Sequence, residues 1–146
     1  MIRLGEYEDL ETIAQLMLDI FEQKMQAKYT KEGQCSFKEL ISLNSLQKRF
    51  LSNNIFYIYT KDKDIKGVIE LESPYHIAFL FSKEVHKGIG KSLCEHAFKN
   101  TKEDICTVGA FEEALGFYKK LGFIEVSETK TFHDLPFTLM ARNLLT

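Results

Sequence analysis

Apolar residues in the first third of the chain recur at the spacing of amphipathic helices. In the first such segment they lie three or four positions apart, with Asp9 before them as a possible N-cap: Leu10, Ile13, Ala14, Met17, Ile20 and Phe21. Ser36 and Glu39 form a capping-box pattern, which predicts that a second helix starts there and ends near residues 52–54. Residues 2–6 are expected to form a short strand before both helices.

The middle of the chain is rich in β-forming residues. Two strand-like runs, 55–60 and 65–72, are separated by the turn-prone residues 61–64, which predicts a hairpin. Residues 76–82 form a third and almost continuously apolar run, as is typical of a buried strand. A glycine-containing loop follows, and then a helix that carries these residues on one face: Ile89, Leu93, Ala97 and Phe98.

The last third alternates between the two kinds of element. A strand, a helix ended by Gly122, and two further strands are expected at residues 104–108, 111–121, 123–129 and 135–144. The order β-α-α-β-β-β-α-β-α-β-β predicts an α+β fold: a mixed, mostly antiparallel twisted sheet of about seven strands flanked by about four helices. Residues 1–146 are expected to form one domain, because this length suits a single core.

Composition and charge narrow the classes of protein. The formal net charge of −2 argues against nucleic acid as a partner. No apolar run is long enough for a membrane helix, and the N-terminal residues are too acidic for a signal peptide. The three cysteines are an odd number at wide spacing, with no metal-ligand pattern and no disulfide framework. We therefore expect a cytoplasmic protein without a metal, and without a membrane partner.

The stretch "KEVHKGIGKSL", residues 83–93, carries the clearest candidate chemistry. A P-loop needs a glycine where Val85 stands, and a dinucleotide fingerprint needs one where Leu93 stands, so the stretch fits neither motif. What remains is a strand, a glycine loop and a helix start with Lys87 and Lys91 beside it. The free N–H groups of such a helix start suit an anion such as a pyrophosphate. The alternative is an ordinary turn that uses glycine for its geometry.

A second motif changes the balance between these interpretations. The glycine loop followed by Phe117-Tyr118-Lys119-Lys120-Leu121-Gly122-Phe123 resembles the GNAT superfamily of acyl-CoA N-acyltransferases. That family has a loop of the form Gln/Arg-x-x-Gly-x-Gly/Ala, whose backbone amides hold the pyrophosphate of coenzyme A. This chain departs from the pattern at Val85, unless His86 takes that place in a loop one residue shorter. It also has Val108-Gly109-Ala110 where the family often has asparagine.

The resemblance implies a GNAT fold and acetyl-CoA as co-substrate. The acetyl group would pass directly to a primary amine, in a small molecule, a peptide or a protein, within a ternary complex; a homodimer is possible. The departures leave a second function open, a catalytically silent acyl-CoA-binding sensor or interaction module. The resemblance implies that coenzyme A contacts Phe79, Leu80, Phe81, Ser82, His86, Lys87, Gly88, Ile89, Gly90, Lys91, Ser92, Gly109, Phe117 and Lys120.

The catalytic candidates follow from the needs of acyl transfer. Tyr118 is the candidate acid, because a phenol is protonated at neutral pH and can donate to a leaving thiolate. The alternative is a core tyrosine on an aromatic helix stripe. Candidates for the base are Glu70 and Glu72, on one face of the third strand, and His76 at the start of the fourth; each could instead be a solvated strand residue. The expected lining of the acceptor pocket is Tyr29, Phe37 and Phe132, with His133 nearby, whereas Cys94 and Cys106 are expected to be buried apolar residues.

Overall fold

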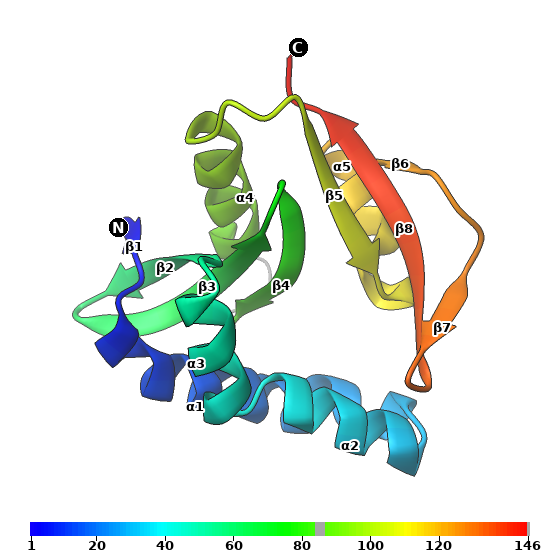
Figure 1. Cartoon of the computed structure of the whole chain (residues 1–146), viewed down its shortest axis with the longest axis horizontal. Coiled ribbons are helices and arrows are strands. Elements are labelled where there is room, and N and C mark those ends of the chain that lie inside the picture. Colours follow the sequence, from blue (N-terminus) through cyan, green and yellow to red (C-terminus); the bar gives the residue numbers. More distant parts are fainter. Residues whose placement is uncertain (84–86, 146) are drawn as a thin grey trace.

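The computed structural model describes residues 1–83 and 87–145, and it has a twisted, mostly antiparallel sheet with helices on both faces (Figure 1). The predicted α+β class is therefore confirmed. The strand order is β1-β2-β3-β4-β5-β8-β6, with β7 paired to the remaining end of β8, and β4–β5 is the parallel pair. The strands are β1 (Ile2–Leu4), β2 (Ile55–Lys61), β3 (Asp64–Glu72), β4 (His76–Ser82), β5 (Ile105–Ala110), β6 (Ile124–Glu125), β7 (Lys130–Phe132) and β8 (Leu135–Asn143).

Two hydrophobic cores lie on opposite faces of the sheet. The α-helices are α1 (Leu10–Ile20), α2 (Lys31–Leu40), α3 (Leu43–Leu51), α4 (Ile89–Lys99) and α5 (Leu115–Lys120). Helices α1, α2 and α3 share one core with Val68 of β3, and α4 and α5 share the other with Ile69, the next residue of that strand. Alternation along β3 thus sends neighbouring side chains into different cores. In Figure 1, α1–α3 lie together below the sheet, apart from α4 and α5.

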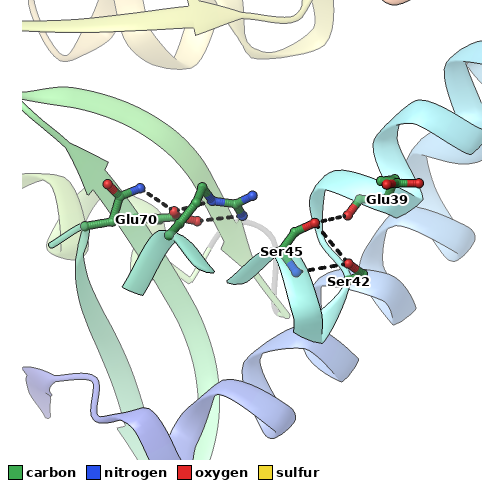
Figure 2. A network of polar contacts seen from close by, with 6 residues as sticks. Glu39, Ser42, Ser45 and Glu70 are labelled. Carbon is green, nitrogen blue, oxygen red and sulfur yellow. Dashed lines mark hydrogen bonds and ion pairs between the residues drawn. The ribbon is translucent and has the colours of Figure 1, made fainter. Parts of the chain in front are cut away.

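The helix predicted to start at Ser36 is instead two helices, so that prediction was wrong. Helix α2 starts earlier, where the Thr30 hydroxyl accepts a hydrogen bond from Gly33 N at 3.0 Å. It ends at Leu40, and Ser42 then caps α3 by accepting from Ser45 N at 3.2 Å. Ser45 Oγ donates back to the carbonyl of Glu39 at 2.7 Å, which fixes the corner between the two helices (Figure 2). Several Ser and Thr residues in this segment could serve as N-caps. The packing of the two helices at the corner determines that Thr30 and Ser42 are the ones that do.

Asp9 stands at the N-cap of α1, as predicted, but its side chain makes no capping bond to the helix. Its carboxylate instead accepts from Glu6 N at 2.7 Å and pairs with Arg3 at 2.8 Å. Of the strand expected over 123–129, only β6 (Ile124–Glu125) forms, and β7 (Lys130–Phe132) follows as a separate strand. Between them the hydroxyl of Ser127 accepts from Leu139 N at 3.3 Å, a hydrogen bond that the backbone ladder would otherwise supply.

The pairing of β4 departs from a regular ladder on both of its sides. Towards β3, Glu70 pairs with Phe79 and Leu71 pairs with Ile77, so Ala78 is an extra residue in a β-bulge. Towards β5, the ladder has two pairs, His76 with Thr107 and Ile77 with Val108. Beyond Ile77 the two strands diverge, and they separate visibly in Figure 1.

Across the described residues, none of the helices has both the length and the apolar character needed to cross a membrane. Cys94 and Cys106 are completely buried, as predicted, whereas Cys35 is exposed. Burial raises the pKa of the Cys106 thiol to about 12, so it stays protonated and acts as an apolar group.

Candidate active site

The divergence of β4 from β5 opens two adjoining cavities. The aromatic cavity, about 230 Å³, lies between β4, β5, α2 and the end of α1. The loop cavity, about 720 Å³, lies between β4, the start of α4, and α5. Five residues line both cavities and so mark their junction: Leu80, Ser82, Glu113, Ala114 and Tyr118. The two cavities therefore form one continuous cleft along the free side of β4.

The loop cavity has the features of an anion site. Gly88 is the N-cap of α4 with a φ of 74°, a conformation that favours glycine. Ser92 N donates to Gly88 O at 2.9 Å, so the amides of the preceding first turn are left for a ligand. A Cβ added to Gly88 would meet nothing within 4 Å, which leaves room for close approach to the backbone. Lys91 and Lys120 add positive charge to the lining.

Most of the predicted coenzyme A residues line this cleft. Those at the aromatic cavity are Phe79, Leu80, Phe81, Ser82 and Gly109. Those at the loop cavity are Leu80, Ser82, Gly88, Ile89, Gly90, Lys91, Phe117 and Lys120. Lys87 and Ser92 are exposed and line neither cavity, and His86 lies outside the described residues.

Tyr118 packs in a hydrophobic core and also lines the cleft. Its side chain is 5% exposed and belongs to the core beneath α4 and α5, where Phe117 and Phe123 pack edge-on against it at 5.1 and 5.3 Å between ring centroids. It also lines both cavities at their junction. Burial raises the pKa of its phenol well above the ordinary value, which keeps the group protonated and able to donate.

Glu70 is a structural residue in this fold. Its side chain is 0% exposed, and its carboxylate accepts from Arg49 Nε at 2.6 Å, Arg49 Nη2 at 3.1 Å and Asn54 Nδ2 at 2.7 Å (Figure 2). The Arg49 guanidinium also lies over the ring of Phe79, at 5.2 Å from its centroid. A carboxylate with both oxygens engaged and no place at either cavity is poorly suited to take a proton from an amine.

The other two base candidates also lie away from the cleft. Glu72 is exposed at the end of β3, and Glu72 and His76 line neither cavity. His76 Nδ1 and Thr107 Oγ1 are 2.8 Å apart, and burial lowers the pKa of the imidazole, although the nearby Glu72 acts in the opposite sense. Thus the structure brings none of the three predicted bases to Tyr118.

The residues expected to line an acceptor pocket divide into two groups. Phe37 lines the aromatic cavity, and Tyr29 packs beside it against Phe111, at 5.7 Å between ring centroids. Phe132, 55% exposed, lies on β7, and His133 borders a separate hollow next to α2.

Glu113 is the residue that sequence reasoning missed. It lines both cavities beside Tyr118, and its Oε1 accepts a hydrogen bond from Tyr29 Oη at 3.1 Å. The two partners are 84 positions apart, so no local pattern could have paired them. The one local signal was an acidic residue shortly after a buried strand and five positions before Tyr118.

The comparison with known families agrees with this geometry. The family model described as Acetyltransferase (GNAT) domain matches residues 25–144. The chain belongs to the GNAT acetyltransferase family. The family in turn supports acyl transfer from acetyl-CoA as the general activity of this GNAT protein.

Solved GNAT structures share the fold over almost the whole chain. One is the PaiA N-acetyltransferase from Thermoplasma acidophilum in complex with coenzyme A, 26% identical, with a TM-score of 0.80 over 98% of both chains. Another is the GCN5-related N-acetyltransferase from Rhodopseudomonas palustris, 22% identical, with a TM-score of 0.82 over 98% of this chain and 94% of that one. The predicted GNAT fold is confirmed.

Proposed function

We propose that this GNAT protein transfers the acetyl group of acetyl-CoA directly to a primary amine in a ternary complex, with Tyr118 as the general acid. The observation that carries the proposal is the continuous cleft along β4, which joins an anion site at one end to an aromatic cavity at the other. Tyr118 lies where the two halves meet, so both substrates could reach one phenol.

The loop cavity suits the pyrophosphate end of coenzyme A. The first-turn amides of α4 would hold the pyrophosphate, with Lys91 and Lys120 near the negative charge. The pantetheine arm would then follow residues 78–82, whose backbone has no ladder partner on β5 in the described residues. Amides of the arm can pair with this free strand side much as an added strand does. Ala78, the extra residue of the bulge, lines the aromatic cavity, and its backbone would lie beside the arm near the thioester.

The proposed reaction needs one general acid, and solvent must accept one proton. The ammonium of the acceptor first loses a proton to solvent, and the neutral amine attacks the thioester carbonyl to form a C–N bond. The carbon–sulfur bond then breaks, and Tyr118 protonates the leaving thiolate. The excess proton on the new amide nitrogen restores the phenol through solvent. Acetyl-CoA and an ammonium thus give an N-acetyl amine, coenzyme A and one proton.

A purified-protein assay tests this proposal. Thiol release from acetyl-CoA is followed with and without a panel of primary amines, and coenzyme A binding is measured separately by calorimetry. Amine-dependent thiol release supports the transferase. Coenzyme A binding without turnover on any amine supports the silent module instead, and stabilisation by ATP but not by coenzyme A would contradict both.

Gly116 offers a clean test of the loop cavity. It lies on α5, lines this cavity, and a Cβ added there meets nothing within 4 Å. We expect Gly116→Met to weaken coenzyme A binding at least about tenfold by filling the cavity, without a loss of melting temperature, because glycine is an unfavourable helix residue. The control Gly116→Ala should bind within about twofold of the parent.

Valine at Gly88 or Gly90 is also expected to weaken coenzyme A binding, but neither variant isolates the ligand. Gly88 has a positive φ, and a Cβ at Gly90 would lie 3.3 Å from Phe117 Cζ. Either valine therefore strains the fold as well. Unchanged coenzyme A affinity in Gly116→Met would place the cofactor elsewhere.

A further inference from the structure

The aromatic cavity has a wall of four phenylalanine rings. Phe37 is at its centre, with ring centroids 5.8 Å from Phe79, 6.1 Å from Phe81 and 5.9 Å from Phe111. All four rings line the cavity: Phe79 and Phe111 are partly exposed, and the buried Phe37 and Phe81 pack behind them. The exposed parts of these rings favour an apolar ligand over a hydrated one.

Glu113 is the only acidic side chain among the described residues that line this cavity. Tyr29 donates to its Oε1 at 3.1 Å, and Tyr29 is itself held by Phe111 and by parallel stacking on Phe21, with ring centroids 6.3 Å apart. Burial, followed by the charge of Glu113, raises the pKa of the Tyr29 phenol, which keeps it a donor. One phenol leaves most of the carboxylate lone pairs free, so Glu113 is positioned without being saturated.

The remaining charge at the cavity is positive. Lys24 lines the same cavity, and its Nζ donates to the carbonyl of Lys83 at 3.3 Å. A ligand with one ammonium can place it on Glu113 and its apolar part on the phenylalanine wall. A second ammonium would meet Lys24 and aromatic rings, with no further carboxylate among the described lining residues.

We infer that Glu113 binds the ammonium of the acceptor, and that the acceptor is a monocationic primary amine on a compact apolar group. Tyr29 positions the carboxylate, and the Phe79 and Phe111 rings, with Phe37 packed behind them, contact the apolar group. This inference rests on the proposed acetyl transfer, because it assigns the acceptor side of the same cleft. The inferred site disfavours polyamines and lysine side chains of peptides. The extra charges of a polyamine and the polar backbone of a peptide would have no matching polar group among the phenylalanine rings.

Four amines at saturating acetyl-CoA test the acceptor class: 2-phenylethylamine, isoamylamine, spermidine and a lysine-containing peptide. We expect kcat/KM for the two apolar monoamines to exceed the values for the other two by at least about tenfold. This ratio corresponds to the free energy gained by burying one or two methylene groups. Equal or better use of spermidine or the peptide would overturn the inference while leaving the transferase proposal intact. Coenzyme A binding without transfer to any of the four would overturn both.

Glu113→Gln tests the carboxylate itself. Removing a charge-assisted hydrogen bond should raise KM for 2-phenylethylamine by roughly ten- to a hundredfold while the Kd of coenzyme A stays within about twofold. Glu112→Gln is the matched control, since Glu112 is the adjacent acid, is exposed as Glu113 is, and lines neither cavity. Calorimetric titration of 2-phenylethylamine into protein saturated with coenzyme A gives a readout without turnover. If the two variants bind the amine alike, Glu113 is not the acceptor-binding residue.

Discussion

Tyr118→Phe is expected to lower kcat by about a hundred- to ten-thousandfold, the usual contribution of a general acid. The variant keeps the ring that packs against Phe117 and Phe123 and removes only the proton donor. Because burial holds the phenol pKa well above its ordinary value, the parent rate should show no loss of the acid between pH 6 and 9. Stopped-assay rates across that range, together with calorimetric coenzyme A affinities, measure both expectations.

A second buried tyrosine supplies the control. Tyr75 is as enclosed as Tyr118, but its hydroxyl donates to the carbonyl of Ala97 at 2.6 Å. Tyr75→Phe should therefore cost about 1 kcal/mol of unfolding free energy with little change in kcat. If Tyr118→Phe turns over at the parent rate and only its stability changes, Tyr118 is a core residue and water protonates the thiolate.

Arg49→Met is expected to lower the free energy of unfolding by about 3–5 kcal/mol, because it leaves the Glu70 carboxylate buried without its cation. Asn54 alone would remain as a donor to that carboxylate. Urea unfolding followed by circular dichroism measures the loss. The double variant Arg49→Met/Glu70→Leu should recover most of it, since a buried ion pair can be replaced by apolar residues at little cost.

The exposed pair Arg3–Asp9 provides the comparison for this prediction. Its contact distance of 2.8 Å is similar, but the arginine side chain is 43% exposed. Arg3→Met should therefore cost less than about 1 kcal/mol. If Arg3→Met and Arg49→Met lower the free energy of unfolding by similar amounts, burial does not make the Arg49–Glu70 pair more important for stability than an exposed pair.

The sequence predicted those parts of the molecule that depend on neighbours along the chain. The hairpin of β2 and β3, the strand β4 and the glycine start of α4 follow from local alternation and turn residues, and all are present. Most residues of β4 are half-buried rather than buried, because β4 borders the cleft. The corner at Ser42 was missed, because Thr30, Ser36 and Ser42 are equally good caps until the helices pack.

The positions of Glu70 and Glu113 depend on contacts between distant segments. Alternation along β3 predicted which face of the sheet the side chain of Glu70 points to. It could not predict the cation that neutralises Glu70, because Arg49 lies on α3, 21 positions earlier. Glu113 lies at the cleft because β4 and β5 diverge, and its hydrogen-bond partner Tyr29 comes from the segment between α1 and α2. In the sequence, Glu70 and Glu113 look like ordinary surface acids. Only the tertiary structure shows that Glu70 is buried and that Glu113 faces the cleft.

The short ladder between β4 and β5 also has a mechanical consequence. Two residue pairs join the sheet half of β1–β4 to the half of β5–β8, and the Tyr29–Glu113 hydrogen bond crosses the opening between them. Coenzyme A seated in this opening would act as an interior strand of the sheet, bonded to one half and packed against the other. The two halves would then unfold as a single unit, and amide hydrogen exchange in β4 and β5 would slow together as the co-substrate concentration rises.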